Sequence, residues 1–135
     1  MIFFFDENIS EYAARMLSYF DRKNEMRAGD AWVRKGTPDK DWLPVVASWG
    51  DKVIVVSGDA RILTNKVERK VLKESNVAFV YLARGWTQLQ WEEYAWKIVK
   101  VWPGIVKIVE QAPYPSVFEV SMGLKVQAES LISKL

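Results

Sequence analysis

The chain contains no cysteine and no histidine among its 135 residues. The absence of cysteine excludes disulfides and thiolate catalysis. It also fits a reducing compartment, so we expect a cytoplasmic protein. The absence of histidine removes the usual general base and the usual zinc ligand. Any catalysis would therefore depend on carboxylates, lysine, tyrosine or hydroxyl groups.

Long hydrophobic runs and an excess of one charge are also missing. The N-terminal apolar run, MIFFF, is short and follows no basic segment, so we expect neither a signal peptide nor a membrane span. The 19 basic and 17 acidic residues give a formal charge of +2, which neither requires nor excludes a nucleic-acid partner. The hydrophobic fraction of 50% is enough for a packed core, and the length predicts one domain over residues 1–135.

The order of apolar and amphipathic stretches predicts an α/β fold. Continuous apolar runs indicate buried strands at 2–5, 53–56 and 76–83. Strand–helix alternation up to residue 82 is typical of a three-layer domain with a mainly parallel sheet. The other expected elements are a helix 11–20 capped by Ser10, a short strand near 31–33, a helix that begins at Asp39 or Asp41, a helix 63–75 with Thr64 as its cap, a helix 86–102 capped by Thr87 and stopped by Pro103-Gly104, a short helix 104–111, and a β-hairpin within 115–128.

Acidic residues follow two of the predicted strands and open one predicted helix. Asp6 comes directly after the first strand, Asp59 follows the strand 53–56, and Asp39 begins a helix with Asp41 beside it. Ligands of open parallel sheets bind beyond the carboxyl ends of the strands. Three segments are therefore expected to bring carboxylates to one edge, although an aspartate after a strand is also a common turn former or cap.

Such a cluster has an electrostatic cost that a bound ion would remove. Two carboxylates about 4 Å apart repel by roughly 4 kcal/mol at an effective dielectric near 20. A shared proton or a divalent cation offsets that repulsion. With only oxygen ligands available, the ion would be Mg²⁺ or Mn²⁺, which suits phosphodiester hydrolysis without histidine.

Three short segments resemble those of a known family. DEN after the first strand, GTPDKDWL at a helix start and SGDARI after the next strand are similar, in order and spacing, to PIN-like nuclease domains. More specifically, the chain resembles the minimal PIN-like (VapC-like) toxins of toxin–antitoxin pairs. The likeness continues through NKVERKVLKESNVAFVYL and WKIVKVWPGIVKIVEQAPYPSVFEVSMG. It implies a PIN-like fold, with a parallel sheet between helices followed by a C-terminal helix and hairpin. It also implies Mg²⁺- or Mn²⁺-dependent ribonuclease activity and an antitoxin partner.

The resemblance also implies roles for individual residues. Asp6, Asp39 and Asp59 would be the catalytic, metal-binding acids, with Asp41 as a further candidate ligand, and Ser57 would support the site by hydrogen bonding. Glu7 and Asn8, which follow Asp6 directly, are candidates from their position alone. They could bind the ion or support the site, although such neighbours more often face solvent or cap the next helix. Larger PIN nucleases carry one more acid between the first two of these segments, where this chain offers only Glu25 and Asp30. The alternative is therefore a catalytically degenerate PIN-like module that binds RNA or a partner protein.

Basic and aromatic residues suggest two further surfaces. Candidate nucleic-acid contacts are Arg61, Lys66, Arg69, Lys70 and Lys73, with Arg27, Arg34 and Lys35 as weaker ones; a solvated basic face is the alternative. The Trp-rich helix within 88–102 is apolar nearly all round. That pattern predicts a homodimer or antitoxin interface, whereas stacking of its tryptophans on RNA bases is the weaker interpretation.

A response-regulator receiver domain is the rival fold. The Asp6-Glu7 pair and Asp59 match the acidic residues of such a domain superficially. A receiver also needs a lysine at the end of its last strand, where this chain has Arg84. The PIN-like resemblance explains more of the acidic segments, so it is preferred.

Overall fold

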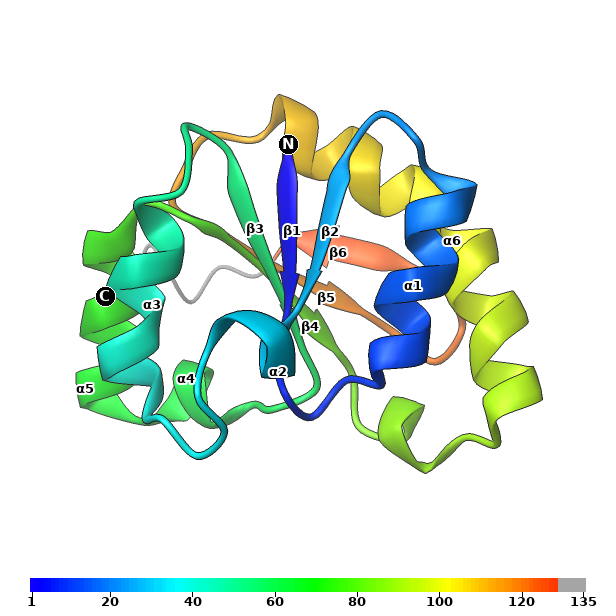
Figure 1. Cartoon of the computed structure of the whole chain (residues 1–135), viewed down its shortest axis with the longest axis horizontal. Helices are drawn as coiled ribbons and strands as arrows, with labels where there is room; N and C mark the ends of the chain where they lie inside the picture. The colour runs from blue at the N-terminus through cyan, green and yellow to red at the C-terminus, as the bar shows by residue number, and fades with distance from the viewer. Residues whose placement is uncertain (129–135) are drawn as a thin grey trace.

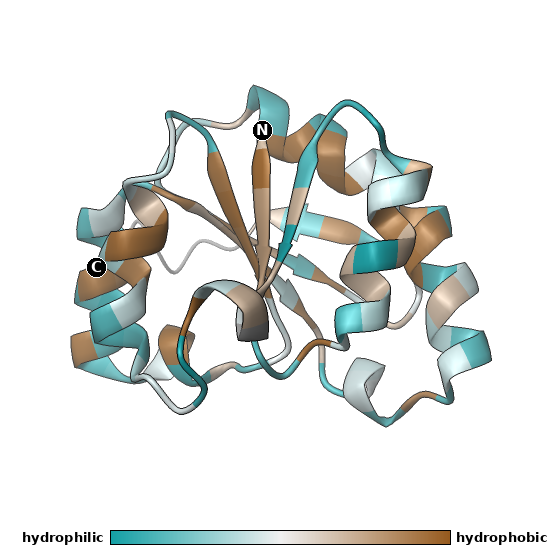
Figure 2. Cartoon of the chain, in the orientation of Figure 1, coloured by the Kyte–Doolittle hydropathy of each residue, from teal (hydrophilic) through white to brown (hydrophobic). Residues whose placement is uncertain are grey.

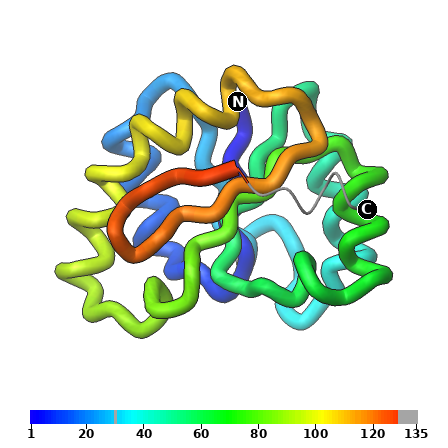
Figure 3. Tube along the Cα trace, turned by 180° about the vertical axis from the view of Figure 1, so that it is seen from behind, coloured from blue at the N-terminus to red at the C-terminus, as the bar shows by residue number. Residues whose placement is uncertain are grey.

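The computed structural model of the chain describes residues 1–128, apart from the side chain of Asp30. A six-stranded sheet with the order β2-β1-β3-β4-β5-β6 forms its centre (Figure 1). All neighbouring strands are parallel except β5 and β6, which form an antiparallel hairpin beyond β4 (Figure 3). The strands are β1 (Ile2–Phe5), β2 (Glu25–Ala28), β3 (Val53–Ser57), β4 (Ala78–Leu82), β5 (Ser116–Val120) and β6 (Val126–Ala128).

Helices cover both faces of the sheet, which confirms the expected three layers. The helices are α1 (Glu11–Phe20), α2 (Gly29–Trp32), α3 (Asp39–Ala47), α4 (Arg61–Thr64), α5 (Lys66–Ser75), the 3₁₀ helix η1 (Trp86–Gln88) and α6 (Trp91–Gln111). Helices α1 and α6 pack on one face, and α3, α4 and α5 pack on the other (Figure 1). Side chains alternate along β1, so Phe3 and Phe5 belong to the first core and Phe4 to the second. Apolar strands are therefore enclosed between helices that carry both hydrophilic and hydrophobic residues (Figure 2).

Several predicted boundaries are confirmed. Strands β1, β3 and β4 and the C-terminal hairpin lie where the apolar runs indicate. Ser10 caps α1, since its side chain accepts a hydrogen bond from the backbone N–H of Tyr12. Helix α3 begins at Asp39 and contains Pro44.

Two local predictions near loops are wrong. The short strand expected near 31–33 is instead β2 at Glu25–Ala28, and residues 29–32 form α2. β2 (EMRA) has no apolar run, and its pairing with β1 at the sheet edge makes it a strand. Thr64 does not cap the next helix; α4 ends there, and the Asn65 side chain accepts hydrogen bonds from the N–H groups of Val67 and Glu68 at the start of α5.

The long C-terminal helix does not stop at Pro103. It runs from Trp91 to Gln111 with Pro103 inside it, and Thr87 lies in η1 and is not its cap. A proline inside a helix costs about 3 kcal/mol. Burial of Ile105 and Val109 beyond it offsets that cost, because full burial of each such side chain stabilises by about 1.5–3 kcal/mol.

The sheet topology places the functional edge. Parallel strands β1, β3 and β4 all end at the same side, which is the lower edge in Figure 1. The turn from β1 to α1, the loops that lead into α3 and α4, and η1 gather at this edge. No helix in the described part of the chain is long and apolar enough to cross a membrane.

Candidate functional site

Asp6 lies at the end of β1 with only 8% of its surface exposed. Its Oδ1 accepts a hydrogen bond from the backbone N–H of Glu7 at 2.7 Å, and its Oδ2 accepts one from the hydroxyl of Ser57 at 2.9 Å. Burial raises the pKa of Asp6 to about 6; the Ser57 hydrogen bond lowers it in part, and the charge of Asp39 raises it. Asp6 is thus a buried carboxyl group that is fixed in place by two donors.

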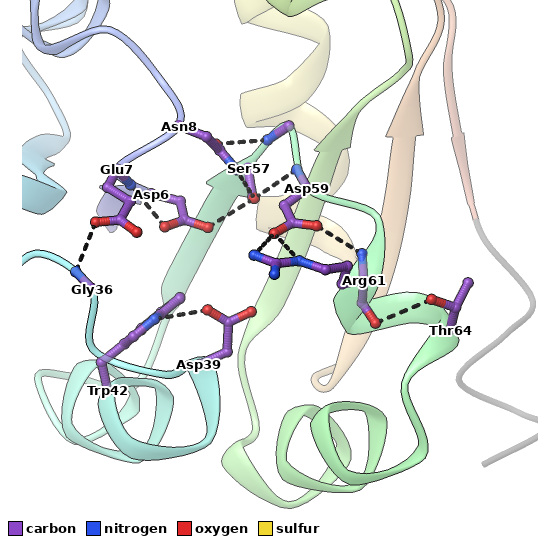
Figure 4. A network of polar contacts seen from close by, with 11 residues as sticks. Asp6, Glu7, Asn8, Gly36, Asp39, Trp42, Ser57, Asp59, Arg61 and Thr64 are labelled. Carbon is purple, nitrogen blue, oxygen red and sulfur yellow. Dashed lines mark hydrogen bonds and ion pairs between the residues drawn. The ribbon is translucent and has the colours of Figure 1, made fainter.

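The hydroxyl of Ser57 joins the ends of β1 and β3. Besides donating to Asp6, it accepts hydrogen bonds from the backbone N–H of Asp59 at 3.0 Å and from Nδ2 of Asn8 at 3.3 Å. The Oδ1 of Asn8 accepts in turn from the backbone N–H of Gly58 at 3.0 Å. Figure 4 shows this network, in which Ser57 and Asn8 make the supporting hydrogen bonds that the sequence predicts for them.

Asp39 faces the same region from the first turn of α3. Its Oδ1 accepts a hydrogen bond from the indole N–H of Trp42 at 2.9 Å. Burial raises the pKa of Asp39, the Trp42 hydrogen bond lowers it, and the charge of Asp59 raises it. Asp41, the alternative ligand from the same turn, is exposed. Asp39 is therefore partly buried at this edge, whereas Asp41 is exposed to solvent.

Asp59 is paired with a cation, unlike the other two acids. Its Oδ2 lies 2.7 Å from Nε and 2.5 Å from Nη2 of Arg61, and its Oδ1 accepts from the Arg61 backbone N–H. Burial raises the pKa of Asp59, but the hydrogen bonds and charge of Arg61 outweigh burial, so the pKa lies below its ordinary value. The Arg61 side chain remains 78% exposed. The sequence predicts that Arg61 contacts the nucleic acid, and in the structure its guanidinium group already pairs with the Asp59 carboxylate.

Together, these acids form a loose cluster of oxygen donors. Figure 4 shows that Asp6, Asp39 and Asp59 come from three segments and lie around one region. The charge of Asp39 raises the pKa of Asp6, and the charge of Asp59 raises the pKa of Asp39. The all-oxygen donor set fits a hard divalent cation in kind. Among the described side chains, which do not include that of Asp30, no three acids converge closely enough to hold a metal ion as they stand.

The remaining predicted acids lie in different places. Glu7 is exposed, and its carboxylate accepts a hydrogen bond from the backbone N–H of Gly36 at 3.2 Å. Glu25 pairs with Ile2 in the register of the sheet, at the opposite edge from Asp6, so it is not the additional acid of this site. Asp30 belongs to α2, and its side chain lies outside the described part of the structure.

The basic candidates divide into two groups. Arg27 is held between the rings of Trp32 and Trp49, with its guanidinium carbon 4.1 and 4.5 Å from their centroids, and it also pairs with Glu25. The Arg27 side chain is therefore already held in packing contacts at β2, the edge strand of the sheet. Arg61 pairs with Asp59, as described above. The remaining candidates form no ion pair with the described side chains, and all but the partly buried Arg69 are exposed: Arg34, Lys35, Lys66, Arg69, Lys70 and Lys73.

Glu68 is a further acid near the site, and the predictions from the sequence do not include it. Burial raises its pKa, as do the charges of Asp39 and Asp59, while Arg61 lowers it. Its Oε2 is buried and has no hydrogen-bond partner in the described structure. Glu68 stands three residues after the cap Asn65, a spacing that marks the first turn of a helix and could have located it near the loop end.

Comparison with known proteins agrees with this architecture. A family profile described as a PIN-like domain matches residues 1–84, which include β1 to β4 and all the acids of the cluster. No curated protein and no solved structure matches the chain. Because the profile covers more than half of the 135 residues, the chain belongs to the PIN-like domain family.

Proposed function

We propose that the chain is a ribonuclease that uses Mg²⁺ or Mn²⁺ to cleave a phosphodiester bond of RNA. The observation that carries this proposal is Asp6, a carboxylate withdrawn from water beside Asp39. A buried carboxylate is normally paired with a cationic side chain or a metal. In the described structure Arg61 pairs with Asp59, and neither Asp6 nor Asp39 has such a partner.

Each residue at the acidic edge of the sheet would have a distinct role in the reaction. Asp6, Asp39 and Asp59 would hold the ion, which would neutralise phosphate charge and activate a water molecule. Ser57 orients Asp6, and Trp42 orients Asp39. The exposed cations of α5, together with Arg61, would attract the phosphate backbone, because such contacts supply most sequence-independent affinity for nucleic acids.

Cleavage of end-labelled single-stranded RNA tests the proposal. We expect activity with Mg²⁺ or Mn²⁺ and none in EDTA. Asp6→Asn and Asp39→Asn are each expected to reduce the rate by about 100-fold or more, since even groups that orient metal ligands contribute about 10- to 100-fold. Asp51→Asn is the matched control, because Asp51 is exposed in the loop that precedes β3, at the opposite edge. Asp41→Asn should also retain activity; its loss would assign Asp41 in place of Asp39.

A PIN-like module without catalysis is the second candidate. The Asp59–Arg61 pair favours it, as does the lack of three converging acids among the described side chains, which leave out that of Asp30. RNA that binds in EDTA but stays intact with either metal ion, combined with no Mn²⁺ binding that Asp6→Asn weakens, would replace the ribonuclease proposal with this one.

The proposed biological partners rest on the sequence resemblance. We propose RNA as the substrate and an antitoxin protein as a partner, with the chain as the toxin of the pair. A small DNA-binding protein encoded next to this chain, which co-purifies with it and suppresses cleavage, is the expected result. The homodimer predicted from the Trp-rich helix is tested by light scattering. One side of that helix, with Ile98, Val101 and Trp102, packs in the core, while Trp91 and Trp96 remain 40% and 53% exposed.

A further inference from the structure

A groove of about 620 Å³ opens beside the acidic edge, between the β1–α1 turn and the segment that leads from η1 into α6. None of the residues that line it carries a charge. They are Asn8, Ile9, Ser10, Tyr12, Thr87, Leu89, Trp91 and Tyr94. An uncharged groove with aromatic walls and a few polar groups is the usual form of a site for a small planar ligand.

Exposed aromatic rings form one wall of the groove. Tyr12 is 58% exposed and Trp91 is 40% exposed, and their centroids lie 6.1 Å apart. Trp91 stacks on Tyr94 at 6.0 Å with an interplanar angle of 18°, and Tyr94 meets the fully buried Trp86 edge-on. The indole N–H of Trp86 donates to the carbonyl of Ser121. The exposed ring of Trp91 is therefore backed by a fixed stack of side chains.

Polar side chains also line the groove. They belong to Asn8, Ser10 and Thr87. The ring of Tyr94 is part of the wall, while its hydroxyl is buried and has no hydrogen-bond partner in the described structure. A ligand of this groove would therefore combine a flat apolar face with hydrogen-bonding edges.

The groove is continuous with the acidic site. Asn8 lines the groove and also hydrogen-bonds both Ser57 and Gly58. A Cβ on Gly58 would lie 2.9 Å from the methyl carbon of Thr87, another lining residue. The residue next to Asp59 thus packs directly against the groove wall. A ligand that reaches from the acids into the groove would need phosphate at one end and a planar group at the other.

We propose that this groove binds an unpaired base of single-stranded RNA, adjacent to the nucleotide whose phosphate lies at the acidic edge. Bases stack on exposed aromatic side chains in a sequence-tolerant way, and their edges supply hydrogen-bonding groups for the polar lining residues Asn8, Ser10 and Thr87. This inference rests on the proposed ribonuclease function, which it extends by naming the base-binding residues. The uncharged walls favour a base over a charged peptide segment of a protein partner.

Binding of labelled single-stranded RNA to the full chain, measured by anisotropy in EDTA, tests the groove without metal or cleavage. Trp91→Ala is expected to weaken binding by about 5- to 100-fold, the range for loss of one stacked base. Trp91→Phe should retain most of the affinity, because it keeps an aromatic face. Trp96→Ala is the matched control, since Trp96 is an exposed tryptophan of the same helix that does not line the groove.

Three results would overturn the inference: no binding of single-stranded RNA by the wild type, equal effects of Trp91→Ala and Trp96→Ala, or an equal effect of Trp91→Ala on duplex RNA. The ribonuclease proposal is judged separately, by cleavage in Mg²⁺ or Mn²⁺. If the wild type cleaves RNA and Trp91→Ala binds RNA as tightly as the wild type, the base-binding proposal is wrong and the ribonuclease proposal stands. If binding depends on Trp91 but no cleavage occurs, the ribonuclease proposal is wrong and the base-binding site stands.

Discussion

At the end of β1, the carboxylate of Asp6 is removed from water without a cationic side chain beside it in the described structure. Hydrogen bonds from Ser57 and the Glu7 backbone compensate only part of the cost, because the pKa still lies about two units above 3.8. One pKa unit corresponds to about 1.4 kcal/mol. The metal-free chain therefore tolerates an unfavourable charge at this position, which is common at functional sites.

Asp6→Asn is expected to change how stability depends on pH. The folded state holds the Asp6 proton more tightly than the unfolded state, so this group makes the wild type less stable as the pH rises from about 4 to about 6. Asparagine has no such titration. In EDTA, the free energy of unfolding of Asp6→Asn minus that of the wild type should increase by up to about 3 kcal/mol as the pH rises from 4 to 7. Urea denaturation at a series of pH values measures this difference.

The absolute stability of Asp6→Asn is a less useful quantity, because asparagine cannot keep both acceptor oxygens for Ser57 and Glu7. The pH-dependent part of the difference is free of that constant offset. Asp51→Asn, a change at an exposed position, should leave the pH dependence of the wild type in place. If the free energies of unfolding of Asp6→Asn and the wild type differ by a constant amount across this range, ionisation of Asp6 does not destabilise the folded protein.

Single residues show what sequence can and cannot predict about the site. Asp6 and Asp59 meet because they follow parallel strands that end at one edge, and Asp39 joins them because α3 begins at that edge. The pairing of Arg61 with Asp59 depends on side-chain rotamers, so it could be learned only from the structure. The spacing of Glu68 from the cap Asn65 places it in the first turn of α5, but its approach to Asp39 depends on how α5 packs.

At the scale of elements, packing overrides local signals twice. Strand β2 has a polar sequence and exists because its backbone pairs with β1, whereas α6 continues through Pro103-Gly104 because the residues beyond it enter the core. Local sequence rules describe a segment in isolation, and both segments receive their stability from neighbours distant in the chain. The strongly apolar strands could be predicted because a continuous run of apolar residues by itself indicates a buried strand.

Gly104→Ala is expected to stabilise the protein by about 0.5–1 kcal/mol. Glycine in a helix interior is less favourable than alanine by that amount, chiefly because it has more backbone freedom to lose. A Cβ at residue 104 would meet only a methyl carbon of Val126 at 3.9 Å, an ordinary contact distance. The midpoint and slope of urea denaturation measure the change, which should raise the midpoint at constant slope.

Gly29→Ala is the matched contrast within the same kind of element. A Cβ there would lie 2.7 Å from the carbonyl oxygen of Phe5 and 3.1 Å from the backbone N of Glu7. Backbone must move to admit it, so we expect a loss of stability and a disturbed Asp6. Destabilisation by Gly104→Ala, or tolerance of Gly29→Ala, would contradict the packing around these two helices.

For the whole molecule, the family match ends at residue 84, but the same sheet continues beyond it through β5 and β6. Strand β5 pairs in parallel with β4 along its full length, and β6 extends the sheet further. The ring of Trp102, from α6, lies 4.7 Å from that of Phe3 and 6.0 Å from that of Phe5 in β1. The first strand is therefore covered by a helix from the unmatched part, and we propose that residues 1–135 act as one domain.

A fragment of residues 1–84 is expected not to fold on its own, because it would leave β4 as an unpaired apolar edge and expose the α6 side of β1 and β3. Amide NMR spectra and urea denaturation monitored by circular dichroism compare it with the full chain. The full chain should unfold in one cooperative transition, while the fragment should show poorly dispersed amide signals and no cooperative transition. A dispersed spectrum from the fragment would instead mean that the family-matched residues form a self-sufficient core. The acidic edge could then exist without α6, whereas the groove that contains Trp91 could not.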